Sequence, residues 1–174
     1  MSYIKYIFRF FFLFLVFSSC KKQSTVSTDV LNEADLTFVD KSAIYDSAEI
    51  RTAQLALAKT TDSVIMSFAS YMLAEHITTR KDLKVMGSVV GFSINDSINA
   101  ANLAVIANLN LLSGRDFDSA YVHTRLDNKA ETERFFINAI NNGNQKNVNS
   151  YASSNLERIR LQYIRADSIA RAFY

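Results

Sequence analysis

Apolar residues recur at intervals of three and four along most of the chain, which is the spacing of one face of an α-helix. In the first stretch, Val39, Ala43, Ile50, Ala53 and Leu57 share one face. Five such stretches predict helices at residues 36–59, 62–86, 97–112, 116–140 and 148–173. The third is the shortest, and we expect it to be an accessory to four long helices.

The segments between these stretches also favour an all-α fold. Gly114 and Gly143 lie near the ends of predicted helices, where glycine tolerates a positive φ. The stretch VMGSVVGFSI, with Gly87 and Gly91, fits a connection better than a strand. Four long amphipathic helices bury their apolar stripes most economically in an antiparallel bundle. We therefore expect an all-α, antiparallel four-helix bundle with an additional short helix.

The first 19 residues are typical of a secretory signal peptide. Lys5 and Arg9 precede the apolar run of residues 10–17, which is shorter than the roughly 18–20 residues that span a membrane. The sequence FSSC then brings the single cysteine, Cys20, directly after this run. The layout resembles a bacterial lipobox, which implies lipid attachment at Cys20. An ordinary signal peptide with a coincidental cysteine is the alternative, since Phe17 stands where a lipobox usually has an aliphatic residue.

The domain organisation follows from this N-terminus. We expect a signal peptide over residues 1–19, the lipidated cysteine and a flexible polar tether over 20–34, and the helical bundle over 35–174. The protein would then be a membrane-anchored lipoprotein of the bacterial cell envelope that faces the periplasm. Its partners would be the membrane, through Cys20, and an envelope protein. Lipid attachment would also occupy the single thiol, which leaves none for a disulfide or a thiolate metal site.

Removing the signal peptide changes the charge balance. The whole chain has 19 basic and 17 acidic residues, and without Lys5 and Arg9 it has 17 of each. No basic run interleaved with aromatic residues remains, so we expect no nucleic-acid partner. The basic last helix indicates a solvated face or, alternatively, contact with a membrane surface. Its arginines are Arg158, Arg160, Arg165 and Arg171.

Two stretches together resemble one protein family. VIMSFASYMLAEHITTRKDL contains Phe68-Ala69, Met72 and Glu75-His76, and LNLLSGRDFDSAYVHTRLDNKAETERFF contains Leu112-Ser113-Gly114, Phe117-Asp118 and Tyr121. They are similar to a bacterial family of exported, ferritin-like helical proteins that is classed as a domain of unknown function and often labelled as predicted outer-membrane proteins. The resemblance covers about residues 38–170. It implies a ferritin-like four-helix bundle in the envelope and no known reaction.

Metal chemistry is the alternative that this resemblance raises. Where the family commonly has an Asp-His pair this chain has Asp127-Asn128, and Gln162 replaces a histidine of the last helix. A ferritin-like di-metal centre needs Glu-x-x-His on two helices, and none of the six glutamates here has a histidine three residues later. Glu49, His76 and Asp127 could still hold one transition-metal ion, but one imidazole with oxygen ligands would bind it weakly. We expect no cofactor, with this single ion as the alternative.

A buried polar layer explains the same residues without a metal. His76, Asn128 and Gln162 each fall on the apolar stripe of a predicted helix. An unpaired buried polar group costs about 1–3 kcal/mol, so such groups tend to find each other. We predict a hydrogen-bonded layer of these three residues, with Glu49 or Tyr121 as further members, that fixes the register of the helices.

No motif assigns a catalytic residue. Neither histidine stands in a recognisable triad, and no glycine-rich phosphate loop is present. The leading interpretation is an exported, lipid-anchored, non-enzymatic protein with a structural or partner-binding role. One alternative is a metal-dependent redox or stress-protection protein of ferritin-like type. Another is a helical binding module with an exposed groove, which a large apolar surface patch would favour.

Overall fold

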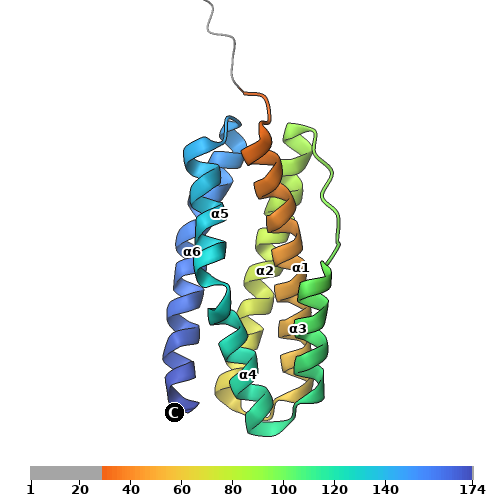
Figure 1. Ribbon diagram of the computed structural model, residues 1–174, viewed down its shortest axis with the longest axis vertical. Coiled ribbons are helices and arrows are strands. Elements are labelled where there is room, and N and C mark those ends of the chain that lie inside the picture. The colour runs from red at the N-terminus through yellow and green to blue at the C-terminus, as the bar shows by residue number, and fades with distance from the viewer. Residues whose placement is uncertain (1–28, 174) are drawn as a thin grey trace, which may run out of the picture.

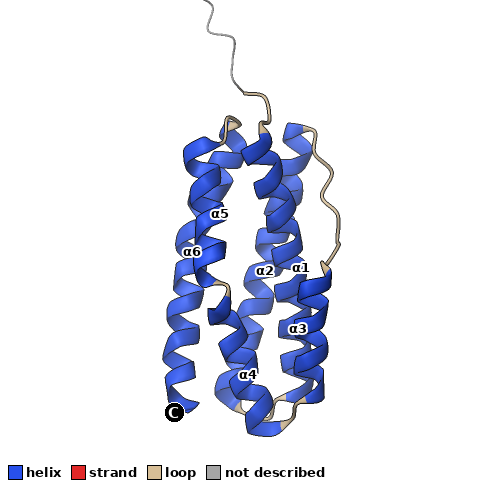
Figure 2. Ribbon diagram, in the orientation of Figure 1, coloured by secondary structure: helices blue, strands red, loops and turns tan. Residues whose placement is uncertain are grey.

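Residues 29–173, the part of the chain that the computed structural model describes, form six α-helices and a short 3₁₀ segment (Figure 1). The elements are α1 (Glu33–Lys59), α2 (Ser63–Val90), α3 (Ala100–Leu111), α4 (Gly114–Asp127), α5 (Lys129–Asn142), α6 (Lys146–Ala170) and η1 (Arg171–Phe173). These residues contain no strand, which confirms the all-α prediction (Figure 2). The predicted signal peptide and Cys20 lie outside the described residues, as does most of the predicted tether.

Two antiparallel pairs of helices build the bundle (Figure 1). The first pair is α1 with α2, and the second is α6 with the consecutive helices α4 and α5. Because α1 also contacts α5 and α2 also contacts α6, the pairs close into a four-helix bundle. Residues 91–99 and α3 return along the outside from the end of α2 to the start of α4, and α3 packs on α1 and α4.

Polar side chains and one glycine set the main helix ends. Asn32 and Asp35 form a capping box at the start of α1, and Asp62 accepts hydrogen bonds from two backbone N–H groups at the start of α2. Asp35 also accepts the N–H groups of Asn144 and Gln145 at 3.0 and 3.1 Å, which ties α1 to the turn before α6. At the end of α2, Gly91 has a φ of 76°, a left-handed conformation that glycine adopts without steric cost.

The predicted helix over residues 116–140 is interrupted in the structure. Asn128 separates α4 from α5 with φ −102° and ψ 10°, outside the helical region. Buried aromatic residues lie on both sides, namely Tyr121 in α4 and Phe136 in α5. The apolar period therefore continues across the break, which is why periodicity alone predicted one helix.

Buried polar residues divide the interior into two apolar cores. The upper core lies towards the start of α1, at the top of Figure 1, and includes Phe38, Leu83, Phe136, Val148 and Ile159. The lower core lies towards the start of α2 and includes Ile65, Phe68, Met72, Phe117 and Tyr121. Along each of α1, α2 and α6, buried polar side chains lie between the residues of these two cores. The candidate site is therefore at mid-height in the bundle.

Candidate functional site

Seven of the buried polar residues that lie between the two cores form a group that we call the polar belt. They are Asp46, Glu49 and Thr52 of α1, His76 and Thr79 of α2, Arg125 of α4 and Gln162 of α6. Four helices thus place two carboxylates, an imidazole, a guanidinium, an amide and two hydroxyls in the interior. Burial of such groups is unfavourable unless they are paired, so their contacts decide what the site can do.

His76 is bound to Asp46. The imidazole is fully buried, and its Nδ1 lies 2.8 Å from Asp46 Oδ1. The Thr79 hydroxyl donates to the same oxygen at 2.9 Å. Because a carboxylate only accepts hydrogen bonds, Nδ1 carries the hydrogen in this contact. The ring of Tyr45 packs edge-on against the imidazole, with 5.3 Å between ring centroids, and this cluster joins α1 to α2.

Glu49 is bound to Arg125. The guanidinium donates to Glu49 Oε2 and, at 3.0 Å, to Thr52 Oγ1, and it lies 5.6 Å from the centroid of the Tyr121 ring. Burial lowers the pKa of Arg125, but the charge of Glu49 and the nearby Tyr121 and Tyr45 more than offset it, so this pKa is raised. The positive charge beside Glu49 is therefore supplied by the chain itself.

Burial also shapes the tyrosines around the belt. It raises the pKa of Tyr45, an effect to which Glu49 adds, and it raises the pKa of Tyr121 although Arg125 opposes it. In α6, burial raises the pKa of Tyr163 to about 12. These side chains are consequently neutral phenols near pH 7, and they can donate hydrogen bonds but are poor bases or nucleophiles.

Several polar atoms in and beside the belt have no hydrogen-bond partner among residues 29–173. They are Asp46 Oδ2, His76 Nε2, both amide atoms of Gln162 and the Tyr121 hydroxyl. Each such group costs about 1–3 kcal/mol if nothing satisfies it, and ordered water commonly does so in protein interiors. Unless water satisfies them, these polar atoms make the fold less stable than apolar side chains at the same positions would.

A small cavity borders the Glu49–Arg125 pair. Its volume is about 70 Å³, and Glu49, Arg125, Tyr45, Asp127 and Asn128 are among its lining residues. Organic ligands generally occupy pockets of roughly 300–1,000 Å³. This cavity is therefore too small for an organic substrate.

The three residues named as the alternative ligands of a single metal ion are not brought together in the structure. Glu49 is paired with Arg125, His76 is bound to Asp46, and Asp127 is exposed. Within the described part of the chain, no group of three or more His, Cys, Asp or Glu side chains could hold a metal ion. The donor set therefore does not fit the metal centre that a ferritin-like bundle would imply.

The predicted polar layer is wrong in its membership. His76 and Gln162 are buried, but Asn128 is exposed because the chain leaves the helical path at that residue. His76 pairs with Asp46 and not with an amide, and Glu49 pairs with Arg125.

The prediction from sequence did not include Asp46 or Arg125, although the spacing of each along its helix indicates burial. Asp46 follows Ala43 by three residues and precedes Ile50 by four, so it lies on the apolar face of this helix. Arg125 follows Tyr121 by four residues and so shares its face. The second histidine, His123, is half-buried on α4, and its Nδ1 lies 2.7 Å from the carbonyl oxygen of Ser119.

The sequence comparison identifies a family. Residues 20–169 match the family described as "Domain of unknown function (DUF4142)". This match spans most of the chain, so the protein belongs to that family, and the resemblance to a family of unknown function is confirmed. No curated protein and no solved structure matches the chain. Among the helices of residues 29–173, none has the length and apolar content needed to cross a membrane.

Proposed function

Starting from membership in a family of unknown function, we propose that this protein is a lipid-anchored component of the bacterial cell envelope with a non-enzymatic, structural or partner-binding role. The observation that carries the proposal is the internal pairing of the belt: His76 binds Asp46, and Glu49 binds Arg125. A catalytic acid or base must come within hydrogen-bond reach of its substrate. Here all four side chains are buried and already engaged with one another.

The connectivity of the helices supports a ferritin-like bundle. Ferritin-like folds have one long crossover between two antiparallel pairs, and residues 91–111 make a crossover of this kind (Figure 1). We propose that this bundle works without a metal ion. Arg125 provides beside Glu49 the positive charge that a metal ion provides to the carboxylates of a metal site.

The anchoring part of the proposal rests on the N-terminal sequence. Cys20 follows a signal-like apolar run, and eight residues separate it from Asp29, where the described structure begins. A chain of that length spans at most roughly 30 Å even when fully extended. The chain enters at the upper end of the bundle (Figure 1), so an anchor at Cys20 would hold this end close to the membrane.

Metal analysis of the full chain tests the proposal, using protein from cells supplied with iron, manganese and zinc. We expect far less than one metal ion per chain, both in the natural protein and in His76→Ala. A stoichiometric metal that His76→Ala loses would refute the metal-free role. Cell fractionation of Cys20→Ser tests the anchor separately: this variant should leave the membrane fraction, and full retention there would contradict lipid attachment.

A further inference from the structure

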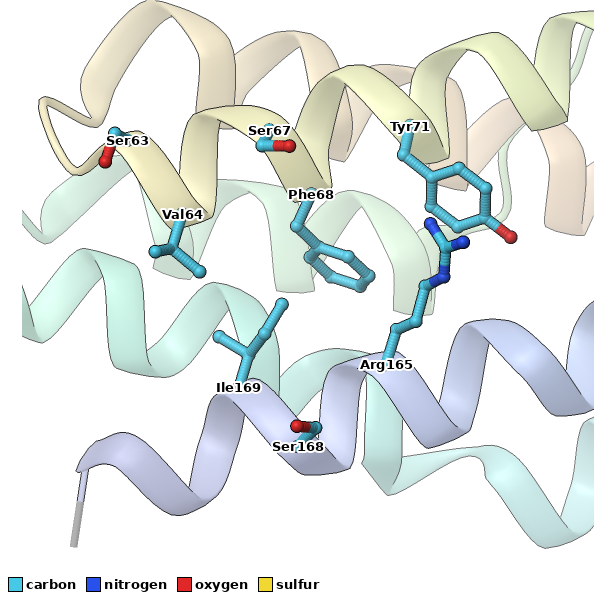
Figure 3. Close-up of a pocket in the computed structure, with 8 residues that line it drawn as sticks. All are labelled: Ser63, Val64, Ser67, Phe68, Tyr71, Arg165, Ser168 and Ile169. Carbon is cyan, nitrogen blue, oxygen red and sulfur yellow. The ribbon is translucent and has the colours of Figure 1, made fainter.

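A groove on the bundle surface lies between the first half of α2 and the last turns of α6 (Figure 3). It has a volume of about 410 Å³, within the range of small-molecule sites. The residues that line it are Ser63, Val64, Ser67, Phe68 and Tyr71 of α2, and Arg165, Ser168 and Ile169 of α6. It is separate from the polar belt and lies at the lower end of the bundle.

Apolar side chains form the floor and one wall of the groove. Phe68 is only 4% exposed and belongs to the lower core, so its position is rigidly supported. Val64 is 56% exposed, and Figure 3 shows that Val64, Phe68 and Ile169 point toward one another between the two helices. An exposed valine over a buried aromatic floor provides a surface on which an apolar body would lose contact with water.

Arg165 gives the groove its charge. It is the one charged residue among the eight that line the groove, and its guanidinium lies 4.0 Å from the centroid of the Tyr71 ring. This stacking holds the guanidinium beside the apolar wall (Figure 3). Within residues 29–173, Arg165 forms no ion pair, whereas Arg158, Arg160 and Arg171 of the same region pair with Glu75, Glu133 and Asp167.

The polar groups along the rim of the groove suit an anion. Ser63, Ser67 and Ser168 are exposed and bring hydroxyl donors to the rim, and the lining includes no carboxylate that would repel a negative charge. Both segments that line the groove are α-helical, so it offers no strand edge with which an extended peptide could pair.

We propose that this groove binds a small amphipathic carboxylate. The apolar or aromatic body would lie on Phe68, Val64 and Ile169, and the carboxylate would accept hydrogen bonds from Arg165 and the neighbouring serine hydroxyls. This inference deepens the proposed binding role and rests on it, because it gives the bundle a ligand and no reaction. The described chain begins at the opposite end of α1, whose 27 residues span about 40 Å, so an anchor at Cys20 would place the groove at the end of the bundle far from the membrane (Figure 1).

Calorimetric titration of the full chain with phenylbutyrate tests the inference, with phenylbutanol and phenylbutylamine as uncharged and cationic counterparts. We expect saturable binding of one phenylbutyrate per chain and at least about tenfold weaker binding of the other two, since a charge-assisted contact is worth about a factor of ten or more. Arg165→Gln should weaken phenylbutyrate binding by a similar factor. Arg160→Gln, on the same helix but outside the groove, should leave it unchanged.

A second variant avoids any dependence on the folded core. Val64→Glu changes an exposed residue and places a negative charge in the groove, so it should abolish binding while the helical circular dichroism spectrum stays the same. Absence of saturable binding at millimolar phenylbutyrate would refute the inference, as would equal binding of the three probes or an unchanged affinity in Arg165→Gln. Metal content and membrane fractionation do not depend on this groove, so such a result would leave the lipid-anchored, metal-free role standing.

Discussion

The ion pair of Glu49 and Arg125 should be strongly coupled, and a double-mutant cycle can measure this coupling. The perturbations are Glu49→Met, Arg125→Met and the two changes together. Glu49 is 7% and Arg125 8% exposed, so either single change leaves an uncompensated charge in the interior. Removing one partner of a buried pair typically costs about 3–5 kcal/mol. Arg125→Met should lie at the upper end, because it also loses the hydrogen bond to Thr52 and the contact with the Tyr121 ring.

The double variant should recover most of that loss. Apolar residues of similar volume can replace a buried ion pair at little net cost, so we expect a net destabilisation of about 1 kcal/mol or less and a coupling energy of at least about 2 kcal/mol. The exposed pair of Lys41 and Glu131, 3.7 Å apart, is the matched control. Lys41→Met should cost no more than about 1 kcal/mol.

Chemical denaturation followed by far-ultraviolet circular dichroism gives these free energies of unfolding. The slope against denaturant should stay the same among the variants, which shows that the change is in stability. If Arg125→Met costs no more than Lys41→Met, or if the Glu49 and Arg125 effects simply add, then the pair does not hold the belt together and the reasoning fails.

Three further predictions concern the same interior. Burial raises the pKa of Tyr163 to about 12, and it also raises the pKa of Tyr45, Tyr121 and Tyr151. A tyrosine whose pKa in the folded state exceeds the unfolded value of about 10 contributes stability that is complete below pH 10. That stability is lost as the pH rises through the folded-state pKa. The thermal midpoint should therefore hold steady up to about pH 9 and fall by pH 11. Above pH 10 the free energy of unfolding should fall by up to about 1.4 kcal/mol per pH unit for each buried tyrosine. A thermal midpoint that does not change between pH 9 and pH 11 would count against this. Asp46→Ala removes the acceptor of His76 and Thr79 and should lower the free energy of unfolding by about 2–4 kcal/mol, against less than half of that for Asp46→Asn; equal losses would contradict the hydrogen-bond argument. Gln162→Leu replaces a buried amide that has no hydrogen-bond partner among residues 29–173, and it should leave the free energy of unfolding equal or raise it by about 1 kcal/mol in the denaturation assay. A loss above about 2 kcal/mol would show that the amide is satisfied.

The helices themselves were predictable because a bundle buries one face of each helix. The predicted range 36–59 lies within α1, and the range 62–86 lies within α2 except for Asp62, which caps that helix. The glycine-containing stretch after them is partly the end of α2 and partly the crossover. The break at Asn128 was not predictable in this way. No proline or glycine marks it, and the apolar period on either side stays in phase.

The contents of the belt could be predicted only in part. His76 and Gln162 stood out as polar residues on apolar stripes, and both are buried. Their partners depend on the relative heights of helices that are distant in the chain, since Asp46 and His76 are 30 residues apart and Glu49 and Arg125 are 76 apart. Periodicity describes one helix at a time, so it carries no information on these heights. A charged residue on the apolar face of a predicted helix, such as Asp46, indicates that its side chain is buried. It does not indicate which residue that side chain contacts.

Histidine-ring NMR of the full chain, with and without Co²⁺, tests most directly the claim that the titratable groups of the belt are paired within the protein. The chain has two histidines, which makes the ring signals easy to assign through His123→Gln. The account predicts that His76 carries its hydrogen on Nδ1, bonded to Asp46, and that its ring signals are unchanged by stoichiometric Co²⁺. Loss of the His76 signals on addition of one equivalent of this paramagnetic ion, with a hydrogen no longer on Nδ1, would contradict it.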